Sequence, residues 1–348
     1  MAARPIRIGT RGSAMALFQA GLVRDRLREA HPELAAEHAI EIVPIRTTGD
    51  RVQTRLLAEI GGKGLFTKEI EEALLDRRID LAVHSLKDME TRLPAGLEIG
   101  CILPRDDPRD VLVSRGGIPL AQLPRGARVG TASLRRTAQL LRARPDLAIA
   151  PIRGNVGTRL DKLAAGEVDA LVLALCGLER LGKADVASEI LSPEDMLPAV
   201  GQGALAVECR AGEAELQRLV GPLNDAASAA CVAAERAMLA ALDGSCRTPI
   251  GGLATIADGR LTLNGLLLSD DGTAERRGRG EGTRLRLDEV RDHLLSRGLC
   301  HARIDRVLSD HRGRAARDRV FRDRPVPGKE HRCRQRCRVR AGLAGLPL

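Results

Sequence analysis

The sequence predicts an α/β protein with two doubly wound lobes, each built on a mostly parallel sheet, and a small α+β domain toward the C-terminus. The chain has 348 residues, more than the roughly 100 to 200 residues of one ordinary domain. A pattern of alternating strands and helices that begins at Arg7 begins again at Arg128. A different pattern, with one helix before several strands, starts near Asp225.

The first lobe is predicted to begin with a short strand at residues 7–10. Ser13 is suited to cap the following helix, because a Ser side chain accepts hydrogen bonds from the free backbone N–H groups of a helix start. Apolar residues then recur along one helical face, at Ala16, Leu17, Ala20, Val23 and Leu27. A second strand at residues 44–46, a helix at about 67–77 and a strand at 79–83 follow.

The second lobe repeats these features in the same order. A strand at residues 128–131 precedes Ser133, which is the predicted cap of a helix, and a strand follows at 151–153. A helix at about 158–165 then leads into a strand at 168–172. Two such units imply a ligand in the crevice at the carboxyl ends of the strands.

Segments rich in proline and glycine separate the predicted lobes. Residues 104–108 and the stretch around Pro198 are the expected hinges, and residues 197–204 are expected to return the chain to the first lobe. The predicted organisation is lobe 1 at residues 1–103 and 200–221, lobe 2 at 109–197, an α+β domain at 225–300 and an Arg-rich tail at 301–348.

The α+β domain is predicted to hold strands at residues 252–257 and 260–269. Asp258-Gly259 between them is a strong signal for a hairpin turn. A third strand near Thr273 and a helix at about 287–297 complete it.

The net charge of +9 comes from the tail. Residues 301–348 hold 14 Lys and Arg against five Asp and Glu, which leaves residues 1–300 with a net charge of zero. Trp and Tyr are absent, so the aromatic rings on which nucleic-acid bases stack are scarce, and we expect no nucleic-acid partner. A tail of this composition is expected to be disordered, whether it is an extension or the product of an altered reading frame.

No stretch of the sequence is apolar over the ~20 residues that span a bilayer, so we expect no membrane partner and a cytoplasmic protein. We also expect a monomer. The eight Cys residues show no paired spacing in the body of the chain and are expected to be reduced thiols. Phosphate-binding loops and dinucleotide fingerprints are incomplete, and no metal site is predicted.

Arginines gather at the predicted strand ends. Arg135 and Arg136 lie in the first turn of a helix, where cations oppose the helix dipole, so their placement suggests a bound anion. Arg11, Arg153 and Arg159 also lie near predicted strand ends. An Arg side chain can bind a carboxylate through two parallel hydrogen bonds. A ligand with several carboxylates or phosphates is the resulting hypothesis, and solvated surface charge is the alternative.

The strand at residues 79–83 is expected to carry Asp88 to the rim of the same crevice, next to Lys87. One interpretation is a structural salt bridge. The other is an acid held ionised by cations, which would stabilise positive charge that develops on a substrate.

Five motifs, taken in order, resemble those of the porphobilinogen deaminase family, also called hydroxymethylbilane synthases. They are His84-Ser-Leu-Lys-Asp88, Gly130-Thr-Ala-Ser-Leu-Arg-Arg136, Arg153-Gly-Asn-Val-Gly-Thr-Arg159, Ala199-Val-Gly-Gln-Gly203 and Asp243-Gly-Ser-Cys246-Arg-Thr-Pro-Ile. The resemblance covers about residues 4–300. It implies two lobes like those of periplasmic binding proteins and a transferase that joins four porphobilinogen molecules into the linear tetrapyrrole hydroxymethylbilane, releasing ammonia. It also implies a dipyrromethane cofactor bound to a Cys through a thioether.

The resemblance assigns roles to single residues. Asp88 would be catalytic, by stabilising the azafulvene cation that forms when ammonia leaves, and Cys246 would carry the cofactor. The other residues expected to hold the cofactor are Arg135, Arg136, Ser133, Thr131, Lys87 and Ser13. Those expected to bind substrate are Arg11, Gln19, Lys63, Arg153, Arg159 and Arg180.

The chain departs from the family pattern in three places. Ser245 stands where Gly often precedes the cofactor Cys, and Met89-Glu90-Thr91 stands where Pro often follows the catalytic Asp. Neither change removes a reacting group. After about residue 300 the sequence does not resemble the family's usual end. A noncatalytic two-lobed receptor for carboxylates or other anions is the competing hypothesis, and a nucleic-acid binder is a weaker third.

Overall fold

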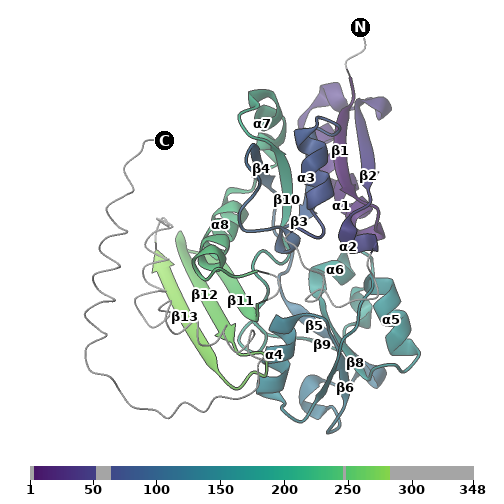
Figure 1. The fold of residues 1–348 in the computed structure, drawn as a ribbon, viewed down its shortest axis with the longest axis vertical. Helices are drawn as coiled ribbons and strands as arrows, with labels where there is room; N and C mark the ends of the chain where they lie inside the picture. Colours follow the sequence, from purple (N-terminus) through teal and green to yellow (C-terminus); the bar gives the residue numbers. More distant parts are fainter. Residues whose placement is uncertain (1–3, 52–63, 246–247, 283–348) are drawn as a thin grey trace, which may run out of the picture. The chain divides into compact units, whose positions relative to one another are not determined.

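The computed structural model describes residues 4–51, 64–245 and 248–282. Within these ranges the chain forms two five-stranded sheets and one three-stranded sheet (Figure 1). The predicted fold class, two α/β lobes and a small C-terminal domain, is confirmed. The predicted helix at 287–297, the tail, Lys63 and Cys246 lie outside the described residues.

The sheet of the first lobe has the strand order β2-β1-β3-β10-β4. Its strands are β1 (Ile6–Arg11), β2 (Ile40–Ile45), β3 (Leu81–Ser85), β4 (Leu97–Ile102) and β10 (Leu205–Arg210). β1 is parallel to both of its neighbours, whereas β10 is antiparallel to β3 and β4. β10, which begins after residue 204, therefore belongs to the same sheet as the N-terminal strands.

Helices cover both faces of this sheet. They are α1 (Ala14–Ala30), α2 (Thr48–Arg51), α3 (Lys68–Leu75) and α7 (Ala214–Val220). Because side chains alternate along a strand, Val83 packs with α1 and α7, whereas Ala82 packs with α3 on the other side. Ser13 caps α1 as predicted, and its Oγ accepts a hydrogen bond from the Ala16 backbone N–H at 3.3 Å.

The sheet of the second lobe has the order β7-β6-β8-β5-β9, which repeats the arrangement of the first. Its strands are β5 (Asp110–Ser114), β6 (Arg128–Gly130), β7 (Ala148–Ala150), β8 (Ala170–Ala174) and β9 (Glu189–Ile190). Its helices are α4 (Leu134–Ala143), α5 (Val156–Ala164) and α6 (Leu175–Glu179). Leu140 of α4 and Leu163 of α5 are buried in separate clusters, and Ser133 caps α4 as predicted.

One detail of the predicted pattern is wrong. The second strand of this lobe ends at Ala150 and does not include residues 151–153. The sheets are mostly parallel, as predicted, and β10 in the first and β5 in the second each run antiparallel to both of their neighbours.

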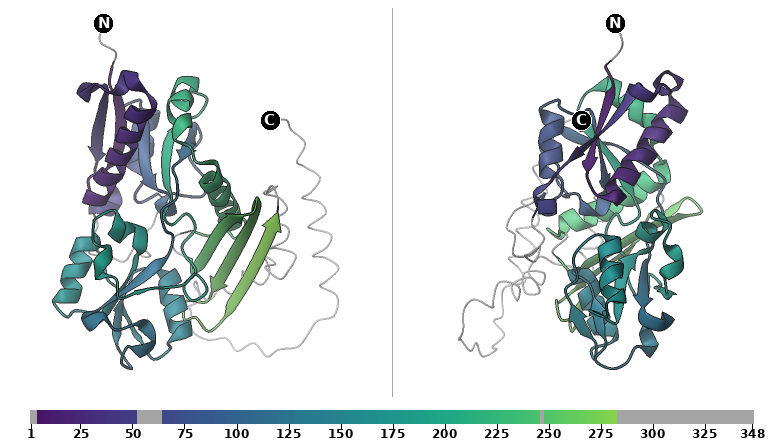
Figure 2. Two further views of the ribbon diagram at one scale, coloured as in Figure 1. Left: turned by 180° about the vertical axis from the view of Figure 1, so that it is seen from behind. Right: turned by 90° about the vertical axis from the view of Figure 1, so that its right-hand side faces the viewer.

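The C-terminal sheet has the order β11-β12-β13, with strands β11 (Ile250–Ala257), β12 (Arg260–Leu268) and β13 (Glu275–Gly282). Asp258 and Gly259 both have positive φ angles, as the predicted hairpin turn requires. Helix α8 (Ala226–Ala241) packs on this sheet through Ala234 and Met238. Figure 2 shows α8 and the sheet beside the lobes, where α8 also contacts β4 and β12 contacts α4.

The two segments that connect the lobes run side by side. The Asp106 backbone N–H donates to the carbonyl of Gly203 at 3.3 Å. Gly203 has a φ of 88°, and a Cβ at this position would collide with the carbonyl oxygen of Asp106. Only glycine therefore allows both the left-handed backbone and this close approach.

We expect Gly203→Ala to destabilise the protein much more than Gly212→Ala. Gly212 also has a positive φ, of 76°, but a Cβ there would meet nothing within 4 Å. The control should lose only the cost of the left-handed conformation, about 1 to 2 kcal/mol. Gly203→Ala should lose about 1 to 3 kcal/mol more, because the collision displaces backbone. Urea unfolding of both variants measures the difference, and equal losses would refute the close-approach argument.

Candidate active site

Asp88 lies on a short turn at the end of β3. The turn, η3 (Leu86–Asp88), follows the strand directly, and the side chains of Leu86 and Met89 on either side of Asp88 are buried. The Asp88 side chain is exposed and forms no hydrogen bond or ion pair with the described residues. The structural salt bridge considered for Asp88 and Lys87 is therefore not observed.

The strand before this turn differs from the prediction. β3 spans Leu81–Ser85 and not the predicted residues 79–83, so His84 belongs to the strand. The His84 side chain is buried, and its Nε2 atom lies 3.0 Å from Oε2 of Glu208 on the neighbouring strand β10. His84 thus contributes to the interior of the first lobe.

Lys87 points toward the connecting segments. Its Nζ donates to Oε1 of Gln202 at 3.3 Å, and Gln202 is fully buried. Burial lowers the pKa of Lys87, although Cys176 and Asp88 nearby oppose that shift. The Nε2 group of Gln202 donates in turn to the carbonyl of Pro108 at 2.6 Å and to Asp110 at 2.8 Å. Lys87 is therefore joined through Gln202 to the start of β5.

Arg135 and Arg136 are both buried at the start of α4 and share one counter-ion. Each guanidinium forms a 2.7 Å ion pair with Asp110, which is fully buried at the first position of β5. Burial alone would raise the pKa of Asp110, but Arg135 and Arg136 outweigh it and hold that pKa well below its usual range. The anion inferred from the helix dipole is thus present inside the protein, so this placement alone does not require a ligand.

The paired arginines still have donors to spare. The Nε atoms of Arg135 and Arg136 are buried and have no hydrogen-bond partner among the described residues. Arg135 also donates to the carbonyl of Leu197 at 2.8 Å, and Arg136 to that of Val172 at 2.9 Å. One carboxylate therefore compensates two positive charges.

Arg159 belongs to the same charged cluster. Burial and the positive charge of Arg136 lower the pKa of Arg159 to about 10, with a smaller effect of Arg153 in the same direction. Asp88 acts in the opposite direction, which places its carboxylate within electrostatic reach of Arg159. The Nε group of Arg159 donates to the carbonyl of Gly154 at 2.8 Å. Electrostatic interactions thus link Lys87 with Asp88 and Arg136, and Arg159 with Asp88, Arg136 and Arg153.

Arg11, at the end of β1, is held by two partners. Its guanidinium forms an ion pair with Asp50 and lies over the ring of Phe66, 4.2 Å from the ring centre. Burial would raise the pKa of Asp50, but hydrogen bonds from Arg11 and Thr47 lower it overall. The charge of Arg11 is therefore partly neutralised by the protein itself.

The predicted polar residues around the helix starts have local partners. Gln19 is buried and exchanges hydrogen bonds with Ser85 at 3.0 and 3.2 Å, next to the Asp88 turn. Oγ1 of Thr131 accepts from the Ser133 backbone N–H at 3.1 Å. Ser13 and Ser133 act as the helix caps described above. These four contacts shape the backbone at the strand ends.

Arg180 follows α6 and binds the connecting segments. Its Nε donates to Asp106 at 2.7 Å, and its Nη2 donates to the carbonyl of Gly203 at 2.8 Å. The side chain of Arg180 is 8% exposed. Arg180 thus joins lobe 2 to both connections between the lobes.

Three important acceptors were missed by sequence reasoning: Asp110, Gln202 and Glu235. Glu235 on α8 is fully buried and forms an ion pair with Arg105 at 2.5 Å. Gln202 lies within one of the five motifs, Ala199 to Gly203, but nothing in the neighbouring sequence indicated a hydrogen-bond partner for its side-chain amide. An acidic residue in an otherwise apolar strand was the available signal for Asp110.

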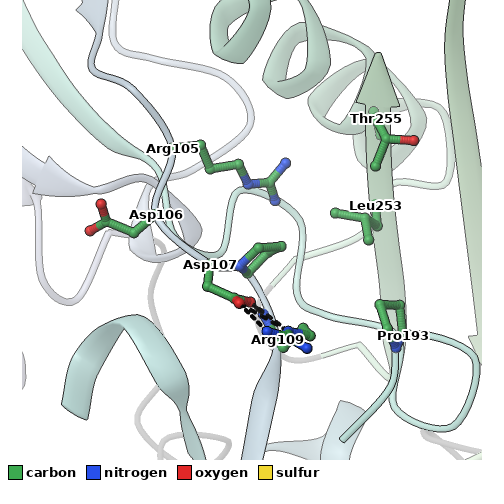
Figure 3. A pocket seen from close by; sticks show the side chains of 9 residues that line it. Arg105, Asp106, Asp107, Arg109, Pro193, Leu253 and Thr255 are labelled. Carbon is green, nitrogen blue, oxygen red and sulfur yellow. Dashed lines mark hydrogen bonds and ion pairs between the residues drawn. The ribbon is translucent and has the colours of Figure 1, made fainter. Parts of the chain in front are cut away.

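A cavity of about 380 Å³ lies beside the connecting segments (Figure 3). It is lined by Arg105, Asp106, Asp107, Pro108, Arg109, Pro193, Leu253, Ala254 and Thr255. Arg109 is paired with Asp107 at 2.6 Å, and Arg105 with Glu235. Asp88 and the arginines of α4 and α5 are not among its lining residues.

The structure agrees with the interpretation of the cysteines in the body of the chain. Cys101, Cys176, Cys209 and Cys231 are free and buried. Burial raises the pKa of Cys101 to about 12 and that of Cys209 to about 11. Over the described ranges, no group of His, Cys, Asp and Glu is arranged to hold a metal ion, and no helix is long and apolar enough to cross a membrane.

Two family models match the chain. The model described as porphobilinogen deaminase, dipyromethane cofactor binding domain, matches residues 6–218. The model described as porphobilinogen deaminase, C-terminal domain, matches residues 229–292.

The chain is also similar to whole proteins. It is 51% identical over 272 residues to the porphobilinogen deaminase of Syntrophobacter fumaroxidans, covering 78% of this chain and 87% of that protein. It is 56% identical over 269 residues to that of Paracoccus denitrificans, covering 77% and 85%. Among solved structures, the aliphatic sulphonate binding protein SsuA of Escherichia coli is 18% identical with a TM-score of 0.37, covering 70% of this chain and 71% of that one.

An ancestral arginine-binding protein is 14% identical with a TM-score of 0.38, covering 64% of this chain and 92% of that one. Such TM-scores support no statement about function. The family models and the curated relatives span nearly the whole described chain, including both lobes and the C-terminal sheet. The chain therefore belongs to the porphobilinogen deaminase family of transferases, the hydroxymethylbilane synthases.

Proposed function

We propose that this chain joins porphobilinogen units head to tail into hydroxymethylbilane, with release of ammonia, at the cluster formed by Asp88 and the arginines of α4 and α5. The single observation that supports this placement best is the state of Asp88. Its carboxylate is exposed, has no hydrogen-bond or ion-pair partner among the described residues, and lies within electrostatic reach of Arg159. A carboxylate that formed a structural ion pair would have such a partner.

The charge balance of the cluster favours a ligand with several carboxylates. Asp110 compensates Arg135 and Arg136 only in part. Arg159 adds a further positive charge nearby, and burial together with the charge of Arg136 lowers the pKa of Arg159 to about 10. Each porphobilinogen brings an acetate and a propionate, and Arg pairs with carboxylates bidentately. Ligand carboxylates would offset the repulsion among these cations.

The same residues fit the dipyrromethane cofactor of the family. The buried Nε atoms of Arg135 and Arg136 have no partner, which leaves donors for the acetate and propionate groups of such a molecule. We propose that Arg135, Arg136, Lys87, Ser133, Thr131 and Ser13 hold it and that Cys246 carries it. When bound, the cofactor supplies the pyrrole carbon to which substrate is added.

We propose that the incoming substrate is bound by the remaining predicted residues, which are Arg11, Gln19, Lys63, Arg153, Arg159 and Arg180. Their surroundings differ. Burial lowers the pKa of Arg159 and the negative charge of Asp88 opposes that shift, whereas Arg11 forms an ion pair with Asp50 and lies over the ring of Phe66. Arg180 is hydrogen-bonded to both connecting segments, so a substrate carboxylate bound by Arg180 would lie next to them.

Asp88 is the proposed catalytic residue. A carboxylate fixed at the end of a strand and free of protein partners stabilises positive charge that develops on the substrate as ammonia leaves. The anchors Leu86 and Met89 hold the turn, so little reorganisation is needed at that moment. The receptor hypothesis gives no reason for such a carboxylate among cations that would bind an anion.

We also propose that the chain works as a cytoplasmic monomer with no nucleic-acid partner. The support for the last point is the zero net charge of residues 1–300, which creates no general attraction for a phosphate backbone.

Purified protein should carry the mass of two linked substrate-derived pyrrole units. Intact-mass spectrometry tests this, and peptide mapping should place the adduct on Cys246. Cys101→Ala is the matched control and should keep the adduct, since Cys101 is buried with a raised pKa of about 12. An adduct retained by Cys246→Ala, or absent from active wild-type protein, would contradict the assignment.

Asp88→Asn should lower turnover by about 10² to 10³-fold, because it removes the negative charge that stabilises the substrate cation. Steady-state assays with porphobilinogen measure this, and thermal unfolding should change little because the side chain has no partner to lose. Asp185→Asn, at an exposed acid elsewhere on lobe 2, serves as the control. Near-normal turnover with a large loss of stability would instead indicate a structural role.

Asp110→Asn should destabilise the protein by about 3 to 5 kcal/mol at neutral pH, because two buried arginines lose their counter-ion. Since the pKa of Asp110 is lowered in the folded state, its contribution is present above the unfolded pKa and is lost as pH falls. The difference between wild type and variant should therefore shrink only below about pH 4.

Urea unfolding at several pH values measures this difference. The exposed pair of Glu281 with Arg279 provides the control, and Glu281→Gln should have a much smaller effect. Equal effects of the two substitutions would contradict a buried stabilising role for Asp110.

A further inference from the structure

The turn that carries Asp88 rests on α8 of the C-terminal domain. Leu86 and Met89, 2% and 6% exposed, pack in one cluster with Val232 of α8. Gly201 approaches Leu86 so closely that a Cβ there would lie 2.7 Å from the Leu86 side chain. The position of Asp88 therefore depends on a helix that is distant in the sequence.

Arg236 lies one turn beyond Val232 on the same face of α8. Its Nη2 group donates to the carbonyl oxygens of Glu90 at 2.8 Å and of Thr91 at 3.1 Å. In the part of the chain that the structure describes, Arg236 forms no ion pair within 4.0 Å. A guanidinium that binds two successive carbonyls fixes the direction in which the chain leaves Asp88.

Glu90 extends this contact toward Arg11. Its Oε1 accepts a hydrogen bond from the Gly64 backbone N–H at 3.0 Å. The carbonyl of Gly64 in turn accepts from the N–H groups of Thr67 and Lys68, which closes the turn that holds Phe66 beneath Arg11. Glu90 is thus the link between the Asp88 turn and the Arg11 side of the cluster.

In this family a proline often stands close behind the catalytic Asp, and a proline side chain cannot form the hydrogen bond that Glu90 forms here. Proline has no carboxylate to accept the Gly64 N–H. The carbonyl that Arg236 binds would be present with either residue, so the Glu90 side chain adds a second attachment to the loop after Asp88.

We propose that Arg236 and Glu90 are positioning residues that hold Asp88 in place from two sides, Arg236 from the C-terminal domain and Glu90 from the turn at residues 64–67. The proposal rests on the proposed catalytic role of Asp88. Both residues act through the backbone of the loop and touch neither substrate nor cofactor. Because the same domain carries Cys246, Arg236 couples the position of Asp88 to the domain that would bear the cofactor.

The test compares Arg236→Met and Glu90→Ala with the conservative variants Arg236→Lys and Glu90→Gln. Arg218→Met is the matched control, because Arg218 is exposed and bonds only to its own helix, at the carbonyl of Ala214. Each protein is first checked by intact mass for the covalent adduct. We then expect kcat to fall by about 10 to 100-fold in Arg236→Met and about tenfold in Glu90→Ala, with KM changed less than about threefold, because a small displacement of a reacting group is costly.

The conservative variants separate positioning from packing. Glu90→Gln keeps an oxygen that accepts the Gly64 N–H and should retain most of the activity. Arg236→Lys keeps the charge, but its ammonium group lies on a shorter side chain than the Nη2 group that makes both contacts, so this variant should be intermediate. Loss of thermal stability in Arg236→Met and Glu90→Ala with an unchanged kcat would overturn the proposal.

A double substitution identifies the residue through which Arg236 acts. If Arg236 works by placing the Asp88 carboxylate, Arg236→Met should cause little further loss in the Asp88→Asn background. The same fold-loss in both backgrounds would overturn the proposal while leaving Asp88 as the catalytic residue. Normal turnover by Asp88→Asn would instead refute the proposed function itself, so the two failures are distinguishable.

Discussion

The arrangement of the domains depends on a single buried carboxylate, Glu235. It lies on α8, has no exposed surface and receives hydrogen bonds from four donors. Arg105 supplies two of them, at 2.5 and 3.2 Å, and the backbone N–H groups of Gly201 and Ala254 supply the others, at 2.7 and 2.8 Å. These donors come from both connections between the lobes and from β11.

The cost of burying this carboxylate explains why so many donors converge on it. Burial raises the pKa of Glu235 even though Arg105 and the two N–H groups favour the charged form. Each carboxylate oxygen accepts one hydrogen bond from Arg105 and one from a backbone N–H group, so removing any one donor would leave a buried charged oxygen with a single hydrogen bond. The connecting segments are therefore held in one favoured position relative to α8. Arg236, the next residue on the same helix, binds the Glu90 carbonyl and so links α8 to the Asp88 turn as well.

The general fold followed from local patterns, whereas the partners of the charged residues did not. The repeat was predictable because Ser13 and Ser133 are strong helix caps and because apolar residues recur at helical spacing. Strand direction in β5 and β10 was not, since a continuous apolar run looks the same in either orientation. Arg135 was recognised as unusual at a helix start, but its counter-ion Asp110 lies 25 residues earlier and only the folded sheet brings them together.

The antiparallel strand in the fourth position of each sheet affects the order in which the two lobes can fold during translation. In lobe 2 every strand lies between Asp110 and Ile190, so all of them are available once that stretch has left the ribosome. In lobe 1, β4 pairs with β10 alone, and β10 begins only at Leu205, after the whole of lobe 2 has been made. Until β10 has been made, the edges of β3 and β4 that face each other have no strand to pair with. The sheet of lobe 2 can therefore be completed before the sheet of lobe 1, although lobe 1 is translated first. Until β10 is made, the nascent chain exposes strand edges that can pair with other chains.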